Sequence, residues 1–121
     1  MRILVVDDEV EPRHRLHEVL AGSGHRVLEA ESGLRALEIL ARESIDLVIT
    51  DVVMPDLDGI GLVHRMKTEH AEVKAIVLSA SDYSQDEIFL KLARVMGAAA
   101  AFRKSISAEK LLEVVETLER M

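Results

Sequence analysis

The chain has 121 residues, of which 49% are hydrophobic, 31% are charged and 2% are aromatic, and its formal net charge is −7. This length suits one domain around a single hydrophobic core, which we predict to span residues 1–121. The negative charge argues against direct nucleic-acid binding and against an anionic membrane surface, and the lack of cysteine excludes disulfides and thiolate metal sites.

Short runs of apolar, often β-branched residues recur along the chain and are predicted to form strands: Ile3–Val6, Arg26–Ala30, Leu47–Thr50, Ala75–Leu78 and Ala99–Phe102. Near-continuous apolar runs of this length are typical of strands buried on both faces of a parallel sheet. Polar residues interrupt the second run, which favours a place at the edge of the sheet.

The segments between these runs have helical periodicity. The apolar stripes are Leu34, Leu37, Leu40 and Ala41, then Ile60, Val63 and Met66, and last Ala108, Leu111, Leu112, Val115 and Leu118. Pro12 suits the first turn of the first helix, Ser32 and Ser107 are predicted N-caps, and a fourth helix is expected near Ser84–Met96. Strict alternation of strands and helices predicts an α/β fold, with a parallel sheet, right-handed crossovers and helices on both faces.

Polar side chains follow the predicted strands where ligands bind in open parallel sheets, beyond the carboxyl ends. They are Asp7 and Asp8 after the first strand, Asp51 after the third, Ser79 after the fourth and Lys104 after the fifth. Taken singly, each has an ordinary explanation as a helix cap, a turn residue or a solvated surface group. Together, the carboxylates would repel one another, and at least one pKa would rise unless a cation intervenes.

A hard divalent cation such as Mg²⁺ would relieve that repulsion. A carboxylate beside Mg²⁺, a lysine and a hydroxyl group is the arrangement that phosphoryl transfer to an aspartate requires. The metal and the lysine neutralise charge on the equatorial phosphoryl oxygens while the carboxylate attacks in line. The occurrence of all these residues at the strand ends therefore favours one functional site over separate structural roles.

These motifs resemble those of response-regulator receiver domains of two-component signal transduction, in the chemotaxis-type receiver superfamily. The similar segments are Ile3–Glu9, with the acidic pair; Asp51–Gly59, with Met54, Pro55 and Gly59 in the family's spacing; Ile76–Ala80, with the switch hydroxyl; and Gly97–Lys104. The resemblance covers essentially the whole chain. It implies a flavodoxin-like (βα)5 three-layer sandwich with a parallel sheet in the order 2-1-3-4-5.

The resemblance also implies a role for each site residue. Asp51 would accept a phosphoryl group from a sensor histidine kinase, a phosphotransfer protein or a small acyl-phosphate donor. The Mg²⁺ ligands would be Asp8 directly, Asp7 mainly through water, Asp51, and the backbone carbonyl of Val53. Lys104 would contact the acyl phosphate, and Ser79 would turn inward to hydrogen-bond it.

On this interpretation the chain is a regulatory domain that catalyses only its own phosphorylation and dephosphorylation, not a turnover enzyme. Phosphorylation would switch the loop after Ser79 and the face made by the fourth helix, fifth strand and fifth helix, which an unidentified downstream protein or output domain would read. Homodimerisation is open. No apolar run approaches the ~18 residues of a membrane span, so we expect no membrane contact and a cytoplasmic location.

The chain departs from the family pattern at several positions. Ser105 replaces the proline that usually follows the lysine through a cis bond, and the higher cost of a cis bond before a non-proline residue favours a trans Lys104–Ser105 bond. Ala101 replaces the aromatic switch residue, Phe102 is predicted to be a core residue, and Tyr83 offers a substitute reporter. Val53 and Ser81 lie where the family modulates water access; neither is acidic or amide-bearing, which predicts slow self-dephosphorylation.

Two alternatives compete with the switch interpretation. Ser105 and Ala101 favour an atypical receiver-fold interaction module that works without phosphorylation. A Mg²⁺-dependent phosphohydrolase with Asp51 as covalent intermediate is weaker, because no second catalytic acid is evident. His14 and His17 lie three residues apart on the first helix, a spacing that can be read as a pair of metal ligands. No third ligand is evident in the sequence, so exposed helix surface is the better interpretation.

Overall fold

A parallel sheet forms the centre of the computed structural model, which describes residues 1–80 and 85–121. Within that part of the chain the strands are β1 (Arg2–Val6), β2 (Arg26–Ala30), β3 (Leu47–Asp51), β4 (Lys74–Ser79) and β5 (Ala100–Arg103), paired in the order β2-β1-β3-β4-β5. This order, the parallel pairing and the edge position of β2 are as predicted. Each strand bound lies within one residue of its expected place.

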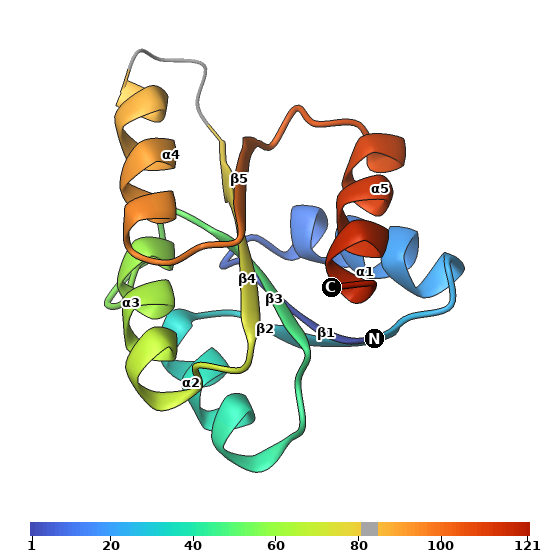
Figure 1. The fold of residues 1–121 in the computed structure, drawn as a ribbon, viewed down its shortest axis with the longest axis horizontal. Helices are drawn as coiled ribbons and strands as arrows, with labels where there is room; N and C mark the ends of the chain where they lie inside the picture. Colours follow the sequence, from blue (N-terminus) through green and yellow to red (C-terminus); the bar gives the residue numbers. More distant parts are fainter. Residues whose placement is uncertain (81–84) are drawn as a thin grey trace.

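Helices cover both faces of this sheet, which gives the predicted flavodoxin-like three-layer sandwich (Figure 1). They are α1 (Val10–Gly22), α2 (Gly33–Arg42), α3 (Gly59–Glu69), α4 (Gln85–Val95) and α5 (Ala108–Glu119). Figure 1 shows α1 and α5 on one face and α2, α3 and α4 on the other. None of the helices in the described ranges combines the length and apolar character that a bilayer span requires.

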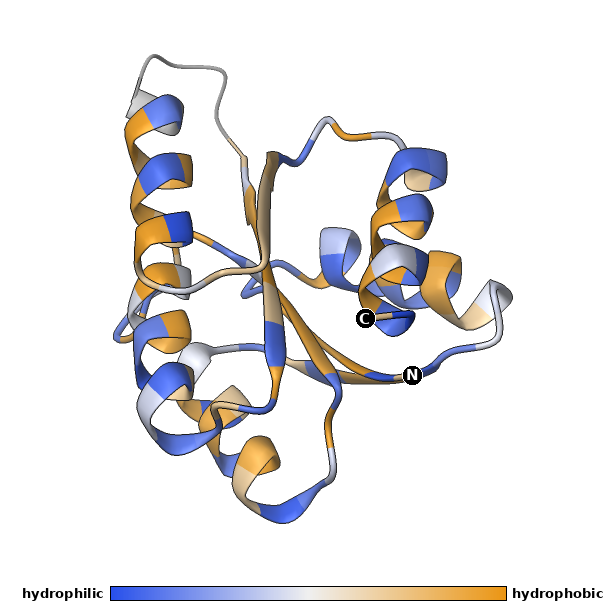
Figure 2. Cartoon of the chain, viewed as in Figure 1, coloured by the Kyte–Doolittle hydropathy of each residue, from blue (hydrophilic) through white to orange (hydrophobic). Residues whose placement is uncertain are grey.

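Side chains that alternate along the strands divide the core into two parts. In β1, Ile3 and Val5 pack with residues of α1 and α5, whereas Leu4 and Val6 pack with residues of α2, α3 and α4. Figure 2 shows strands that are mostly hydrophobic and helices along which hydrophobic and hydrophilic residues alternate. Because burial of each large aliphatic side chain stabilises the fold by ~1.5–3 kcal/mol, this double core holds the strand ends in fixed positions.

The N-terminal ends of α1, α2 and α5 agree with the signals in the sequence. Ser32 Oγ accepts a hydrogen bond from Arg35 N at 3.0 Å, and Ser107 Oγ accepts one from Lys110 N at 3.0 Å, so both predicted N-caps are confirmed. Pro12 falls in the first turn of α1. The expected start of the fourth helix at Ser84 lies outside the described residues, as do Ser81 and Tyr83.

The predicted buried face of α2 was wrong in part. Leu34 is 49% exposed and Ala41 is exposed, whereas Ala36 and Ile39 are buried. Leu34 and Ala36 lie about 200° apart around the helix axis, so the sheet can cover only one of them. The stripe on α3 is confirmed, because Ile60, Val63 and Met66 are buried. On α5, Leu111, Val115 and Leu118 are buried, while Ala108 is exposed.

Candidate functional site

Carboxylates from the ends of β1 and β3 meet at one edge of the sheet. Asp7, Asp8 and Asp51 each offer an oxygen, and these oxygens all lie within 4.8 Å of one another. Asp7 and Asp51 are only 1% and 6% exposed, whereas Asp8 is exposed. The expected gathering of acidic side chains at the carboxyl ends of the strands is therefore present, and it is largely removed from solvent.

Lys104, which follows β5, extends its side chain into this acidic cluster. Its Nζ donates to Asp7 Oδ2 at 2.7 Å and lies 3.4 Å from Asp51 Oδ2. The lysine is thus placed between the two buried carboxylates, closer to Asp7 than to Asp51. The sequence predicted that the lysine compensates the acidic charge, but it did not identify Asp7 as the nearer partner.

Burial and neighbouring charge change the protonation equilibria of this pair. Burial raises the pKa of Asp51, and the charge of Asp7 adds to that rise, while the Lys104 ammonium opposes it. For Lys104, burial disfavours the charged form, but the hydrogen bond to Asp7 and the charge of Asp51 outweigh it and raise the pKa of Lys104. The charged form of Lys104 is therefore favoured, while the charged form of Asp51 is disfavoured by its burial despite the nearby ammonium.

The loop after β3 fixes the Asp51 carboxylate. Val52 N donates to Asp51 Oδ1 at 2.8 Å, and Gly59 N donates to Val52 O at 2.8 Å, which closes the loop back on the strand end. A Cβ at Gly59 would overlap the Asp51 carbonyl oxygen, so only glycine allows this close approach. The side chain of Val53 is 72% exposed and points away from the core, so this residue can contribute a main-chain oxygen without a packing conflict.

Ser79 ends β4 beside the same cluster. The hydroxyl-bearing residue is 3% exposed, and the register of β3 with β4 pairs Asp51 with Leu78, one residue before it. Lys104 N donates to Ser79 O at 2.7 Å, so the backbones of these two residues are joined directly. A displacement at Ser79 therefore acts on the backbone that carries the lysine.

The departures from the family pattern lie along β5 and the loop after it. The Lys104–Ser105 bond is trans, as predicted. Ala101 is 1% exposed, and Phe102 packs half-buried against the α1 and α5 side of the core, as predicted. The carbonyl of Ala101 accepts a hydrogen bond from Arg94 of α4 at 2.9 Å.

Sequence reasoning did not identify Arg13 as a neighbour of the site. Its Nη1 donates to the backbone oxygen of Asp7 at 2.9 Å, and Glu9 N donates to Asp7 Oδ1 at 2.9 Å. The only signal in the sequence is that Arg13 lies one turn into the helix that follows the acidic pair. These contacts fix the conformation of the loop that carries Asp7 and Asp8.

Comparison with known proteins agrees with this architecture. Residues 3–116 match the family model described as the response regulator receiver domain. The chain is 31% identical over 115 residues to sporulation initiation phosphotransferase F of Bacillus subtilis, covering 95% of this chain and 90% of the relative. It is 32% identical over 120 residues to response regulator MprA of Mycobacterium leprae, covering 99% of this chain but only 51% of that relative.

A solved structure gives the same result for the fold. The response regulator protein TrrA of Thermotoga maritima, in complex with Mg²⁺-BeF, is 34% identical, superposes with a TM-score of 0.85 and is covered over 97% of both chains. The chain therefore belongs to the response-regulator receiver family. Receiver domains are regulatory phosphoacceptors that interact with histidine kinases or phosphotransfer proteins and bind Mg²⁺ at an acidic pocket.

The residues of this chain fit such a metal. The cluster offers only hard oxygen donors, as Mg²⁺ prefers, and two of its carboxylates are buried close to each other. Burial, with a further contribution from the charge of Asp7, raises the pKa of Asp51, and a bound cation would favour the charged carboxylate.

Proposed function

We propose that residues 1–121 act as one phosphoacceptor receiver domain in which the Asp51 carboxylate takes the phosphoryl group. The observation that carries this proposal is the position of Asp51: buried, fixed by Val52 N, 3.4 Å from the Lys104 ammonium and within the acidic cluster. A sensor histidine kinase, a phosphotransfer protein or a small acyl phosphate would supply the phosphoryl group.

The transfer step follows from these groups. A carboxylate oxygen of Asp51 forms a bond to phosphorus, the bond from phosphorus to the donor nitrogen or oxygen breaks, and its electron pair leaves with the donor. The Val52 N–H fixes the rotation of the attacking carboxylate, and Lys104 holds positive charge where the equatorial oxygens gain negative charge. Ser79, at the adjacent strand end, would hydrogen-bond the product.

Asp8, Asp7, Asp51 and the Val53 carbonyl would hold Mg²⁺ in this proposal, Asp8 directly and Asp7 mainly through water. When bound, the ion supplies charge neutralisation for the phosphoryl oxygens and for the carboxylates themselves.

The test is phosphorylation by acetyl phosphate with Mg²⁺, followed by intact mass. We expect the wild type to gain one phosphoryl group, Asp51→Asn to gain none, and chelation of the metal to abolish the gain. Asp56→Asn is a matched control, because Asp56 is an exposed aspartate of the same loop with a positive φ of 69° that asparagine also adopts. Equal phosphorylation of Asp51→Asn, or none of the wild type with Mg²⁺ bound, would refute the proposal.

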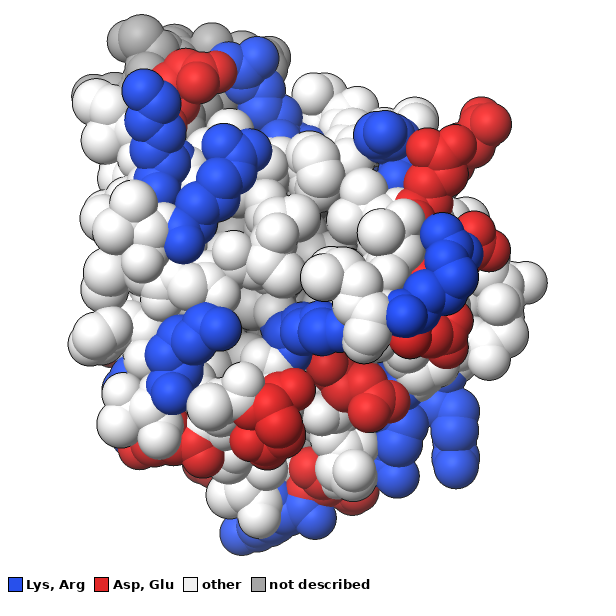
Figure 3. Space-filling model, in the orientation of Figure 1, with Lys and Arg blue, Asp and Glu red and all other residues white. Residues whose placement is uncertain are grey.

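The output would pass through the face made by α4, β5 and α5. Arg94 of α4 binds the Ala101 carbonyl at 2.9 Å, and Glu87 of α4 pairs with Arg103 at 3.1 Å, so polar contacts link α4 to β5 where the family has an aromatic residue. Figure 3, drawn from the side that presents this face, shows charged groups of both signs around a largely uncharged middle. We propose that phosphorylation shifts α4 relative to β5 through Ser79 and Lys104, and that a downstream protein reads this shift.

We also propose that the phosphorylated form persists. Val53 is 72% exposed at the rim of the site and has no group that would orient a water molecule. We therefore expect self-dephosphorylation to take minutes or longer. The decay of the phosphorylated mass after the donor is removed measures its rate. A half-life of seconds would contradict this expectation, and Val53→Asn, which adds an amide there, should shorten the half-life.

A second candidate is an interaction module that works without phosphorylation. The buried methyl group of Ala101 favours it, because the usual aromatic rearrangement cannot occur there. Equal affinity of the phosphorylated and unphosphorylated protein for the same partner would support this candidate, and a difference of about tenfold or more would support the switch. In either case we propose a cytoplasmic protein without direct nucleic-acid contact.

A further inference from the structure

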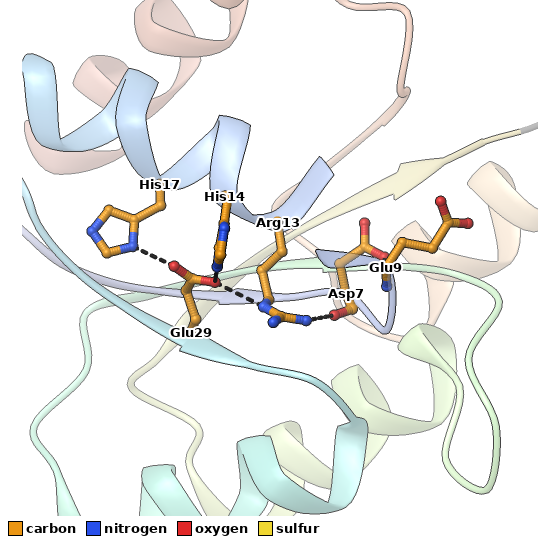
Figure 4. A network of polar contacts seen from close by, with 6 residues as sticks. All are labelled: Asp7, Glu9, Arg13, His14, His17 and Glu29. Carbon is orange, nitrogen blue, oxygen red and sulfur yellow. Dashed lines mark hydrogen bonds and ion pairs between the residues drawn. The ribbon is translucent and has the colours of Figure 1, made fainter. Parts of the chain in front are cut away.

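A series of polar contacts connects the edge strand β2, through a side chain of α1, with the residue that follows β1 (Figure 4). The α1 side chain is Arg13. Its Nε donates to Glu29 Oε1 at 2.7 Å, and its Nη1 donates to the backbone oxygen of Asp7 at 2.9 Å. Figure 4 shows the guanidinium between these two acceptors, so it is held at both ends.

All four polar atoms of Asp7 have a partner in this arrangement. Its N donates to Ala30 O at 3.1 Å, its Oδ1 accepts from Glu9 N at 2.9 Å, and its Oδ2 accepts from Lys104 Nζ at 2.7 Å. Arg13 supplies the fourth contact, to the backbone oxygen. Asp7 is only 1% exposed, so water cannot replace the arginine unless the loop changes its conformation.

The backbone oxygen of Asp7 belongs to the peptide unit that leads to Asp8. Because a peptide unit is planar, holding this oxygen also fixes the N–H of Asp8 and the direction of its Cα. The Asp8 side chain is exposed, and within the described residues no hydrogen bond or ion pair holds it. The position of its carboxylate, within 4.8 Å of the other two, therefore depends on the backbone.

We infer that Arg13 is a positioning residue for the metal site, because it holds the Asp7–Asp8 peptide unit in the orientation that allows both carboxylates to bind one Mg²⁺. The inference rests on the proposed function for the identity of the ion. It adds to that function a residue that is not itself a ligand. Helical side chains lean toward the N-terminus, so Arg13, one turn after the start of α1 at Val10, can reach back to this carbonyl.

Glu29 neutralises the guanidinium beside the metal site. An uncompensated arginine there would repel a divalent cation, and the ion pair with Glu29 reduces that repulsion. The side chains of Arg13 and Glu29 are only 13% and 22% exposed, so solvent screens this pair less than it screens a surface pair. The carboxylate therefore both orients the arginine and limits its electrostatic effect on the ion.

The two histidines of α1 contact the same carboxylate. His17 Nδ1 lies 2.6 Å from Glu29 Oε2 and His14 Nε2 lies 3.3 Å from Oε1, and their side chains are 37% and 58% exposed. Among the described residues, the acidic cluster alone brings three ligand atoms close enough to share an ion. These findings agree with the interpretation of the histidine pair as helix surface.

Charge and position predict opposite results when Arg13 is replaced. If the positive charge of Arg13 had the larger effect, its removal would favour the cation and strengthen Mg²⁺ binding. If the orientation of the peptide unit has the larger effect, as we infer, its removal weakens Mg²⁺ binding. Residues that orient metal ligands without touching the metal commonly change affinity by about tenfold or more.

The test is a calorimetric titration of Mg²⁺ into the protein at constant pH and salt, without a phosphodonor. We expect Arg13→Met, which keeps the aliphatic stem, to bind Mg²⁺ about tenfold more weakly than the wild type. Arg13→Lys should also bind more weakly, because its ammonium keeps the charge but lacks the planar fork that donates to two acceptors. Glu29→Gln should show a smaller loss in the same direction.

Arg2→Met is the matched control. Arg2 begins β1, and its Nη2 donates to Glu43 at 3.1 Å, at the other end of the strand from the acidic pair. This variant should bind Mg²⁺ as the wild type does. Thermal unfolding without metal checks that each variant is folded before its affinity is compared.

Phosphorylation by acetyl phosphate gives a second readout, which a loss of stability alone would not change. The Mg²⁺ concentration that gives the half-maximal rate should rise in both Arg13 variants, while the rate at saturating Mg²⁺ stays near that of the wild type. A wild type that binds Mg²⁺ but takes no phosphoryl group refutes the proposed function alone, because the affinities are measured without a donor.

Three outcomes would overturn the inference about Arg13. The first is a wild type that binds no Mg²⁺. The second is wild-type or tighter Mg²⁺ binding by the folded Arg13 variants. The third is a loss of affinity in Arg2→Met as large as that in Arg13→Met.

Discussion

At the residue scale, the loop between β3 and α3 can close back on the strand end only because Gly59 lacks a Cβ. Gly59 lies against the backbone of Asp51, and an added Cβ would overlap the Asp51 carbonyl oxygen, which cannot move without moving the end of β3. We expect Gly59→Ala to destabilise the fold by about 1–3 kcal/mol and to slow phosphorylation. Denaturant unfolding and intact mass measure the two effects.

Gly22→Ala is the control for that substitution. Gly22 is the last residue of α1, and a Cβ there would meet no atom within 4 Å. We expect Gly22→Ala to leave the free energy of unfolding unchanged or to raise it by up to ~1 kcal/mol, because alanine reduces the entropy of the unfolded chain. If both substitutions cost the same, the close approach at Asp51 is not the cause of the effect.

The contacts of Glu29 on β2 with side chains of α1 should make the free energy of unfolding depend on pH. Burial alone would raise the pKa of Glu29, but hydrogen bonds from Arg13 and His17 outweigh it and lower the pKa below its ordinary 4.5. A carboxylate with a lowered pKa in the folded state stabilises the fold above pH 4.5, and this contribution is lost as the pH falls through the folded-state pKa.

The corresponding variant is Glu29→Gln. We expect it to be about 1–2 kcal/mol less stable than the wild type near neutral pH, and the difference to shrink as the pH falls below 4.5. Glu38→Gln, at an exposed pair with Arg35, should cost less than about 0.5 kcal/mol. A difference between wild type and Glu29→Gln that is constant with pH would show that the glutamate charge does not contribute.

The sequence predicted which residues gather at the site better than it predicted which of them contact one another. The acidic residues, Ser79 and Lys104 were found because each follows a strand, and parallel topology brings strand ends together. The contact of Lys104 with Asp7 was not predictable, since it depends on the path of a flexible four-carbon side chain. Glu29 stands out in the sequence as a charged residue within a strand. Its pairing with α1 was not predictable, because it depends on the distance between two packed elements.

At the scale of elements, α4 is the segment whose attachment we expect to matter most for signalling. Arg94 donates from α4 to the carbonyl of the buried Ala101, across the boundary that the proposed switch would move. We expect Arg94→Met to destabilise by about 1 kcal/mol and to increase amide hydrogen exchange in β5 and α4.

Arg65→Met serves as its control. Arg65 pairs with Glu69 four residues along α3, at an exposed position within one helix. Because this pair is exposed, its loss should change the stability little and leave exchange in β5 unchanged. Equal exchange in the two variants would mean that the Arg94 contact does not hold α4 to β5.

Elements were predictable where local signals agree with burial. Short runs rich in apolar residues located the strands of the described residues within one residue, and serine caps located the starts of α2 and α5. The face of α2 was assigned wrongly in part because Leu34 and Ala36 offer competing apolar stripes, and only packing against the sheet selects between them. Periodicity gives the direction of a stripe but not its burial.

At the scale of the whole molecule, the acidic cluster should couple metal binding to stability. In the proposed site Mg²⁺ would bind the folded arrangement of Asp7, Asp8 and Asp51, which the unfolded chain lacks, so we expect Mg²⁺ to raise the unfolding midpoint. The expected stabilisation is about 2.7 kcal/mol when free Mg²⁺ is about 100 times its dissociation constant. Asp8→Asn should remove most of this response, and chelation should reverse it.

The control for the metal response is Asp46→Asn. Asp46 accepts a hydrogen bond from Arg2 N at 2.8 Å at the start of β1, so it lies at the other end of the sheet from the cluster. This variant should keep the full Mg²⁺ response even if its basal stability falls. Loss of the response in both variants would place the ion elsewhere.

The two outer strands of the described sheet also limit how copies of this chain can associate. A strand with a free edge offers N–H and C=O groups to strands of other molecules, which is a common route to aggregation. β2 carries the charged residues Arg26 and Glu29, and β5 is only four residues long and ends in Arg103. Both features disfavour a continuous sheet between molecules, so any dimer should form through side-chain surfaces and not by extension of the sheet.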